Sequence, residues 1–307
     1  MDVSVVIPAY NEEGNVEQLY KELRTVLGKL RKNYELIFID DGSSDSTLDK
    51  LRSLRKKDKK VKVISFQRNF GKAAALTAGF KHANGKLIFT MDADLQDDPA
   101  EIPSFITKIN DGYDLVSGWK YRRRDPLTKK IPSKFFNWLT AKTTGVNIHD
   151  SNCGFKCYRK EVLDKVHIYG ELHRYIPALA HWKGFGVGEV RVNHRPRTSG
   201  KSKYGFTRLF KGFLDLITIK YLTTYMRRPA HLFGFAGFGL SVIGLLSGLY
   251  LIYLKIIGQT IGDRPLLFLT VLLALIGVQF ISLGLLGEMI ANQFKKEDEY
   301  VIQEVLK

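Results

Sequence analysis

The chain has 307 residues, of which 45% are hydrophobic and 12% aromatic, so it is neither a disordered polymer nor a low-complexity repeat. Lysine and arginine outnumber aspartate and glutamate by 47 to 31, and the net charge of +16 predicts a surface that attracts anions. The two cysteines, Cys153 and Cys157, exclude a disulfide framework, and we expect them to be ordinary buried thiols.

The first 120 residues show alternating strand and helix patterns. In chain order, the periodicity of apolar residues predicts strand, helix, strand, helix, strand, helix and strand at residues 3–8, 12–30, 36–39, 46–56, 61–66, 72–82 and 87–91. Such alternation predicts an α/β domain with a mainly parallel sheet and helices on both faces. Ligands of these sheets bind at the carboxyl ends of the strands, so the candidate site should lie there.

Polar residues follow three of the predicted strands, in the strings PAYNE (8–12), DDGSSD (40–45) and DAD (92–94). Each string alone has an ordinary explanation, since Asp45 would cap the next helix and Asn-Glu is common in turns. Together they predict several carboxylates at one edge of the sheet. An Asp-x-Asp sequence after a strand can supply two oxygen ligands to a divalent ion that bridges to nucleotide phosphates. A nucleotide diphosphate with a metal ion is therefore the predicted ligand.

Four strings carry a family resemblance: VVIPAYNEE, IDDGSSDST, NFGKAAALTAGF and MDADLQDDP. They resemble those of family 2 glycosyltransferases with the GT-A (Rossmann-like) fold, and more closely the polyprenyl-phosphate sugar transferases. The likeness extends to about residue 225. It implies inverting transfer of a hexose from a UDP- or GDP-sugar to undecaprenyl or dolichyl phosphate, with Mg²⁺ or Mn²⁺ as cofactor. The metal would stabilise negative charge on the leaving diphosphate.

The resemblance also assigns residues to the donor and the metal. It implies that the donor nucleotide is held by Pro8, Ala9, Tyr10, Glu12, Asp40, Asp41, Asp92 and Ala93. It implies a metal site made of Asp92, Asp94 and Gln96, with Asp94 also taking part in catalysis.

Cations are needed to hold the phosphate of a lipid acceptor in line with the sugar. Two basic segments, 122–130 and 194–203, could supply them or could be ordinary solvated surface. The resemblance implies acceptor-phosphate contacts from Arg122, Ser133, Arg195 and Arg197. Lys129 or Lys130 stands where relatives often have another arginine.

Two further blocks resemble family motifs. In HDSNCGFK (149–156), Asp150 is the candidate base or acceptor-orienting carboxylate, the alternative being a structural turn residue. Cys153 and Lys156 depart from many relatives in this block, and we assign them no role. The segment ELHRYIP (171–177) resembles one that borders the sugar pocket, which implies roles for Glu171, His173 and Arg174.

The C-terminal part is apolar. Residues 232–254 and 266–287 contain no charged side chain, so each predicts a helix that spans a bilayer rather than one buried in a soluble core. Residues 204–226 mix bulky apolar and basic residues, which fits an interfacial helix or an ordinary amphipathic one. Gly244 and Gly248 form a GxxxG motif, which leaves self-association open.

We therefore expect a catalytic domain at 1–203, interfacial helices at 204–231, a two-helix transmembrane anchor at 232–287 and a tail at 288–307. Residues 232–287 carry +1 and the tail −2, which leaves +17 on residues 1–231. Together with the cations that flank both spans, this predicts an inner-membrane protein with its catalytic domain and both termini in the cytoplasm and no cleavable signal peptide.

Three other functions share some of these sequence features with the predicted sugar transferase. A non-catalytic, membrane-tethered nucleotide-binding adaptor would keep the same fold. Nucleic-acid binding by the basic domain is disfavoured, because the chain combines apolar spans with no groove-reading motif. A processive polysaccharide synthase is disfavoured because the chain contains no Arg-Trp pair, which the QxxRW motif of those enzymes requires.

Overall fold

A computed structural model describes residues 1–121, 141, 145–146, 148–150, 153–166, 172–195, 218 and 229–293. The chain divides into two compact units, Met1–Ile219 and Lys220–Lys307, and each is considered separately. The interfacial helices predicted at 204–231 lie almost entirely outside the described residues.

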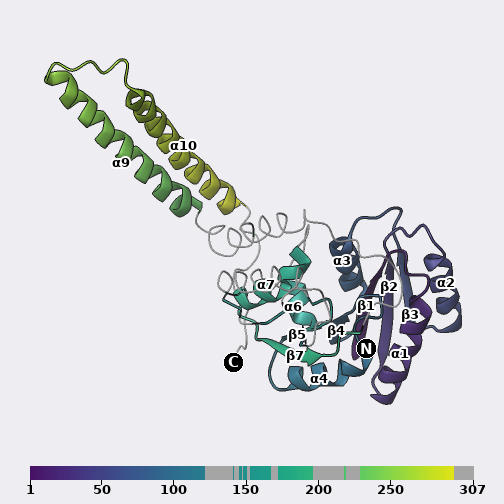
Figure 1. The fold of residues 1–307 in the computed structure, drawn as a ribbon. Helices are drawn as coiled ribbons and strands as arrows, with labels where there is room; N and C mark the ends of the chain where they lie inside the picture. Colours follow the sequence, from purple (N-terminus) through teal and green to yellow (C-terminus); the bar gives the residue numbers. More distant parts are fainter. Residues whose placement is uncertain are drawn as a thin grey trace. The chain divides into compact units, whose positions relative to one another are not determined.

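The first unit alternates strands and helices as the sequence predicts (Figure 1). Its elements are β1 (Val3–Ala9), α1 (Val16–Lys29), β2 (Tyr34–Asp40), α2 (Thr47–Lys57), β3 (Val61–Ser65), α3 (Lys72–His82), β4 (Leu87–Thr90), η1 (Pro99–Glu101), α4 (Ile102–Asn110), β5 (Leu115–Lys120), β6 (Lys156–Arg159), α6 (Lys160–Lys165), η2 (Leu172–Tyr175), α7 (Ile176–Trp182) and β7 (Val187–Val192). All seven predicted elements before residue 92 are confirmed. The helix predicted from residue 12 begins at Val16, and residues 12–15 form a turn in which the Asn15 N–H donates to the Glu12 carbonyl (2.9 Å).

Seven strands form one sheet in the order β3-β2-β1-β4-β6-β5-β7. β1 pairs in parallel with β2 and β4, β2 pairs in parallel with β3, and β5 pairs in parallel with β7. Only β6 is antiparallel to its neighbours in this sheet. The expectation of a mainly parallel sheet is confirmed.

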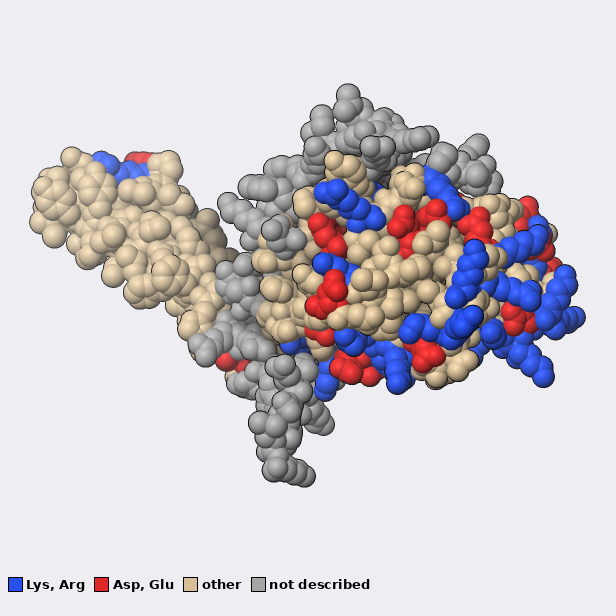
Figure 2. Space-filling view, turned by 90° about the horizontal axis from the view of Figure 1, so that it is seen from below, with Lys and Arg blue, Asp and Glu red and all other residues tan. Residues whose placement is uncertain are grey.

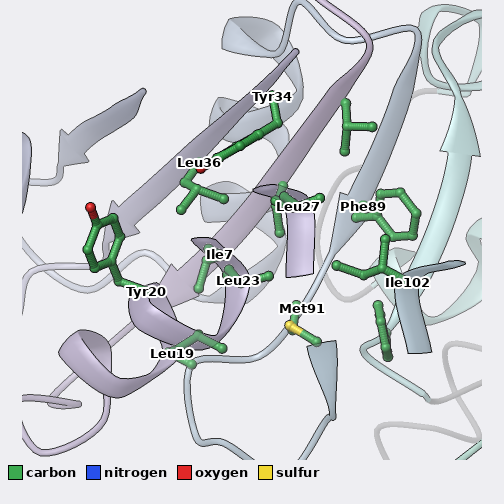
Figure 3. Close-up of a cluster of buried hydrophobic side chains, with 14 of the residues drawn as sticks. Ile7, Leu19, Tyr20, Leu23, Leu27, Tyr34, Leu36, Phe89, Met91 and Ile102 are labelled. Carbon is green, nitrogen blue, oxygen red and sulfur yellow. The ribbon is translucent and has the colours of Figure 1, made fainter. Parts of the chain in front are cut away.

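Helices cover both faces of the sheet. In β1, Val3, Val5 and Ile7 pack on the face covered by α1, α2 and α4, whereas Val6 packs on the α3 face. The first of these clusters is drawn in Figure 3, where Leu19, Leu23 and Leu27 of α1 lie over the strands. A third cluster, beneath α6 and α7, lies on the same face of the sheet as the α3 cluster, since Phe80 and Leu163 pack against both. Alternation along the strands thus places apolar side chains in both layers.

A closed polar network lies at the amino-terminal edge of the sheet. The buried carboxylate of Glu35 accepts hydrogen bonds from the Ser4 hydroxyl (2.6 Å) and the Asn84 backbone N–H (2.7 Å). It also pairs with the Lys62 ammonium (2.6 Å). Ser4 in turn accepts from the Gly85 N–H (2.8 Å), so these groups join β1, β2, β3 and the turn before β4.

The second unit is a helical hairpin of α9 (Pro229–Ile256) and α10 (Pro265–Gln293). Both helices are long and apolar enough to cross a membrane, and they contain the two predicted spans. In Figure 2 the surface of the hairpin is almost entirely uncharged, whereas Lys, Arg, Asp and Glu are mixed over the first unit.

Glycines allow α9 and α10 to approach each other closely. A Cβ added at Gly237 would lie 2.5 Å from the Gly277 carbonyl oxygen, and one at Gly244 would lie 3.1 Å from the Ala274 nitrogen. The Thr270 hydroxyl also donates to the Ser247 hydroxyl across the pair (2.9 Å). Gly244 of the predicted GxxxG motif therefore packs the two helices of one chain against each other.

Candidate active site

Three polar strings predicted from the sequence converge at the carboxyl edge of the sheet. Ala9 at the end of β1 lies in register with Asp40 at the end of β2, and the Asp41 N–H donates to the Ala9 carbonyl (2.9 Å). β4, which precedes Asp92, is the other neighbour of β1. Because these strands are parallel, residues 8–12, 40–45 and 92–94 lie at one edge.

The loops after β1 and β2 bind each other. The Asn11 side chain accepts from the Ser44 N–H (2.8 Å), and the Asn11 N–H donates to the Ser43 hydroxyl (3.0 Å). Asn11 has φ +56°, an unusual conformation for a residue other than glycine. The Asp45 carboxylate accepts from the Thr47 N–H at the start of α2 (3.0 Å), although the N-cap residue of that helix is Ser46 and not Asp45.

Several residues predicted to hold the donor have hydrogen bonds within this framework. Asp40 accepts from the Ser43 N–H (3.3 Å) and the Ser65 hydroxyl (3.1 Å). Asp41 accepts from the Phe70 and Gly71 N–H groups (2.7 and 3.0 Å), which lead into α3. Glu12 accepts from the Asn15 side chain (2.6 Å). Ala9 and Ala93 are buried, whereas Pro8 and Tyr10 are half-buried at the same edge. Their donor contacts stay predictions.

Asp92 is paired with a lysine that the sequence analysis did not single out. Lys72, the first residue of α3, donates to Oδ1 of Asp92. The other carboxylate oxygen packs against Gly154, where an added Cβ would lie 2.6 Å from Oδ2. Burial raises the pKa of the Asp92 carboxyl, but Lys72, with help from Lys120 and Lys156, lowers that pKa to about 2. Asp92 is therefore ionised at neutral pH.

The loop after Asp92 holds a second and a third carboxylate. Asp94 is buried and accepts from the Gln96 N–H (3.2 Å). Leu95 between them has φ +60°, a conformation that costs a non-glycine residue about 1–3 kcal/mol and that clusters at functional sites. Asp97 is buried and pairs with Lys120 (3.0 Å). Burial raises the pKa of Asp97, and the charges of Asp92 and Asp94 add to that rise.

The 94–98 loop is joined to the segment that carries one predicted acceptor residue. Asp97 forms an antiparallel bridge with His194, and the Arg195 N–H donates to the Gln96 carbonyl (2.9 Å). The Arg195 guanidinium pairs with Glu22 (2.7 Å) and Asp98 (2.8 Å) beside a cavity of about 290 Å³. The structure thus brings Arg195 to the loop that follows the Asp-x-Asp, but it gives the guanidinium two carboxylate partners.

Asp150 and Lys156 are both buried. The Lys156 ammonium donates to the Cys153 carbonyl and interacts electrostatically with Asp150 and Asp92. Burial lowers the pKa of Lys156. Burial also raises the pKa of the Cys153 thiol to about 12, and both cysteines are buried and free, as predicted. Lys156, which received no role from the sequence, is therefore a buried cation within electrostatic range of both Asp150 and Asp92.

His173 and Arg174 lie in η2, which packs against α3. Burial lowers the pKa of His173 to about 3, with further contributions from the charges of Lys72 and Arg174. The ring is therefore neutral at physiological pH. His173 interacts electrostatically with Asp92 as well, so the residue predicted for the sugar pocket lies near the predicted metal ligand.

Four other predicted site residues lie outside the residues that the structure describes: Arg122, Ser133, Glu171 and Arg197. Their assignments to the acceptor phosphate and the sugar pocket stay predictions.

The chemistry of the described acids fits a divalent ion that also binds a phosphate ligand. Within the described ranges, no group of three His, Cys, Asp or Glu side chains is arranged to hold a metal ion. Mg²⁺ is usually bound by one or two carboxylates plus substrate phosphates rather than by a complete protein cage. Asp92 and Asp94 provide such a pair after β4, so the residues fit an ion that completes its coordination with a diphosphate and water.

The sequence analysis missed Lys72, Lys120 and the buried Asp97, and it named Lys156 without giving it a role. One signal was available, because a helix that follows a parallel strand begins at the edge of the sheet where ligands bind. Lys72 opens α3 at that edge. The positions of Lys120 and Lys156 depend on the pairing of β5 with β6, which gave no local signal.

Comparison with known proteins bears on this arrangement. Residues 4–167 match the protein family described as "Glycosyl transferase family 2". The chain is 39% identical to dodecaprenyl-phosphate galacturonate synthase from Rhizobium johnstonii, over 99% of this chain and 93% of that protein. It is 36% identical to undecaprenyl-phosphate 4-deoxy-4-formamido-L-arabinose transferase from Shewanella sediminis, over 99% and 92%.

The fold resembles that of glucosyl-3-phosphoglycerate synthase from Mycobacterium tuberculosis, solved with Mn²⁺, UDP and glucosyl-3-phosphoglycerate. The TM-score is 0.55 at 18% identity, and the match covers 72% of this chain and 79% of that one. The expectation of a GT-A fold is confirmed.

Proposed function

The chain belongs to glycosyl transferase family 2, and we propose that it transfers a sugar from a nucleotide diphosphate sugar to a polyprenyl phosphate at a membrane. One observation carries this proposal. A single chain combines a carboxylate pair at the carboxyl end of β4 with two candidate membrane spans, and relatives named for polyprenyl-phosphate substrates align with 99% of it.

The donor in this proposal is a UDP-sugar at the carboxyl edge of the sheet. UDP is present in the complex of the structurally similar enzyme, and the loops after β1, β2 and β4 are available to contact it. We assign the nucleotide to residues 8–12, 40 and 92–93, and we assign Asp41, whose two oxygens accept from the Phe70 and Gly71 N–H groups, to the start of α3. The predicted hexose is one candidate sugar, but the named relatives use a galacturonate and a formamido-arabinose, so both sugar types belong in a donor screen.

In the proposed reaction, an oxygen of the lipid phosphate attacks the anomeric carbon. The bond from that carbon to the diphosphate oxygen breaks, the nucleoside diphosphate leaves with the bonding electrons, and the anomeric configuration inverts. A divalent ion held by Asp92 and Asp94, with Gln96 nearby, supplies stabilisation of the charge on the leaving diphosphate when it is bound. We propose Mg²⁺ or Mn²⁺, since Mn²⁺ accompanies UDP in the similar structure.

The acceptor phosphate is already anionic, so the site does not need a strong base. We propose that the buried Asp150, within electrostatic range of Lys156, orients the acceptor, and that Arg122, Ser133, Arg195 and Arg197 bind its phosphate. Arg195 would exchange a carboxylate partner for the phosphate. We assign Glu171, His173 and Arg174 to the sugar pocket, where the neutral ring of His173 can donate or accept a hydrogen bond.

We also propose that the protein resides in an inner membrane, with α9 and α10 as spans and with the catalytic domain and both termini in the cytoplasm. Support comes from the apolar surface of the hairpin and from the excess of positive charge in residues 1–231.

The direct test uses the full chain purified in detergent micelles. It is incubated with undecaprenyl phosphate, Mn²⁺ or Mg²⁺ and a panel of UDP-galacturonate, UDP-4-deoxy-4-formamido-L-arabinose, UDP-glucose and GDP-mannose. We expect one donor to give a glycolipid and free nucleoside diphosphate, and we expect chelation of the metal to stop the reaction.

The control is Asp111→Asn, which changes an exposed acid outside the site. It should retain activity, whereas Asp94→Asn should lose it. Absence of glycolipid with every donor, while UDP still binds, would overturn the proposal in favour of the nucleotide-binding adaptor.

A further inference from the structure

Lys72 and Asp92 form an ion pair that remains open to solvent. The Lys72 ammonium contacts Oδ1 of Asp92, and the two side chains are 34% and 35% exposed. Lys72 projects from the first residue of α3, directly after Gly71 at φ +92°. An ion from solution can therefore reach the oxygen that the lysine contacts.

A divalent ion bound to Asp92 would compete with Lys72 for this carboxylate. Oδ2 of Asp92 packs so closely on Gly154 that an added Cβ would lie 2.6 Å from it. Oδ1 lies somewhat farther from that position, at 3.1 Å, and it is the oxygen that Lys72 contacts. An ammonium group and a divalent cation on one oxygen would repel each other strongly, so the two are alternative partners.

The other two lysines of the site are held elsewhere. Lys120 pairs with Asp97 and its side chain is 14% exposed, while Lys156 is buried and donates to the Cys153 carbonyl. Lys72 is the most exposed of the three and ends a flexible side chain. Its ammonium can therefore reach solvent when it leaves Asp92.

We propose that Lys72 is a placeholder cation, which occupies the metal position on Asp92 in the ligand-free protein and is displaced when a divalent ion binds together with a nucleotide diphosphate. This inference rests on the proposed function. A bare ion must break the Lys72 pair and gains only protein and water ligands. An ion that arrives with a diphosphate gains phosphate oxygens as well, and these offset the cost of breaking the pair, so the pair keeps the bare ion out at metal concentrations where the ion and the nucleotide bind together.

The test measures Mn²⁺ binding rather than turnover, by the electron paramagnetic resonance signal of free Mn²⁺ over the full chain in detergent micelles. In Lys72→Met, we expect Mn²⁺ without nucleotide to bind about three- to tenfold more tightly than in the parent. Mn²⁺ binding in the presence of UDP should tighten by a similar factor, because the Lys72 pair is broken in both cases and its cost cancels from the coupling between Mn²⁺ and UDP. Lys72→Arg keeps the charge and should remain close to the parent.

The matched control is Lys108→Met, which removes one positive charge and an exposed ion pair with Asp111 (3.8 Å) away from the site. Its affinity for Mn²⁺ should equal that of the parent. If Lys72→Met binds bare Mn²⁺ no more tightly than Lys108→Met, the placeholder role is wrong.

A second measurement uses the unsubstituted protein, in case Lys72→Met does not fold. Saturating Mn²⁺ should speed acetylation of Lys72, read by mass spectrometry, relative to Lys108. An unchanged ratio would contradict displacement. Failure of the proposed function has a different signature: Asp92→Asn would then leave Mn²⁺ binding in the presence of UDP unchanged, whatever the result for Lys72.

Discussion

Both edges of the central sheet carry a carboxylate paired with a lysine, yet the two pairs differ in what surrounds them. At the amino-terminal edge, Glu35 is 1% exposed and accepts from Ser4 and Asn84 in addition to Lys62. At the carboxyl edge, the side chain of Asp92 is 35% exposed and pairs with Lys72, which can leave. A lysine–carboxylate pair thus occurs once inside a buried hydrogen-bond network, at Glu35, and once where solvent reaches it, at Asp92.

This difference in exposure and in hydrogen bonding indicates that Glu35 contributes to stability and Asp92 to ligand binding. A buried charge whose hydrogen bonds are all made inside the protein contributes to folding and leaves no group for a ligand. A carboxylate that solvent can reach, beside a second carboxylate two residues away, retains its capacity to bind a cation. Substitutions at the two edges should therefore change different observables.

The largest effect should follow Asp92→Asn at the open edge. Loss of the carboxylate weakens the stabilisation of the leaving diphosphate, and we expect kcat to fall by about 10²–10³, as for removal of one electrostatic contact to a transition state. The melting temperature should change little, because the Lys72 side chain is freed into solvent. Glycolipid synthesis and thermal unfolding of the same preparations check both expectations.

Asp111→Asn serves as the control for charge, since Asp111 is exposed and pairs only weakly with Lys108 (3.8 Å). If Asp92→Asn has a much lower melting temperature than the parent and its folded fraction keeps the parental kcat, Asp92 contributes to stability and not to catalysis, and the contrast between the two edges is wrong.

The closed edge should respond in the opposite way. Glu35→Gln loses charge-assisted hydrogen bonds, each worth about 1.5–3 kcal/mol. Lys62 is 40% exposed and can turn to solvent, so the substitution does not strand a buried cation. We expect the melting temperature to fall by about 4–8 °C. The kcat of the folded enzyme should stay within twofold of the parent, an estimate of about 0.4 kcal/mol.

The pH dependence of stability sharpens this contrast. Burial raises the pKa of Glu35, but Lys62, Ser4 and Asn84 outweigh it, and the pKa lies below the ordinary value of 4.5. A folded-state pKa below the unfolded value means that the stabilisation is complete above pH 4.5 and is lost as the pH falls through the lower, folded-state pKa. Melting curves from pH 7 downward should therefore show a steeper acid loss for the parent than for Glu35→Gln. Parallel curves would contradict the lowered pKa.

Much of this arrangement could be predicted from the sequence, and the limit has a physical cause. Strands such as β2 read as continuous apolar runs because both of their faces are buried, and the acids after β1, β2 and β4 meet because parallel strands end at one edge. The pairing of Lys72 with Asp92 could not be derived, because it depends on a side chain reaching from α3 to the end of β4.

The role of Glu35 could not be predicted from the sequence either. Its partners come from β1, β3 and the turn at Asn84, and nothing near Glu35 in the chain marks it as the centre of a network. Periodicity reports which face a residue occupies, but it does not report which polar groups meet across strands.

The smallest effect is expected at Asp41. This residue also tests most directly whether a carboxylate at the functional edge contributes to stability or to ligand binding. This acid lies at the functional edge, yet its two oxygens accept from the Phe70 and Gly71 N–H groups before α3. Asp41→Asn replaces one acceptor with an amide that cannot accept, and a lost cap of this kind costs about 1 kcal/mol. We expect the melting temperature to fall by about 2–4 °C, and the Kd for UDP to rise by no more than about threefold.

Asp49→Asn on the exposed side of α2 is the matched control, since it removes an acid paired on the surface with Arg52 (3.2 Å). A tenfold weaker affinity for UDP in Asp41→Asn, with an unchanged melting temperature, would make Asp41 a ligand-binding residue, as the resemblance implied. The expected pattern instead makes it a residue that fixes the start of α3. Lys72 is the first residue of that helix, so the hydrogen bonds of Asp41 also position the solvent-exposed pair of Lys72 and Asp92. The functional edge of the sheet therefore depends on Asp41 as a structural carboxylate.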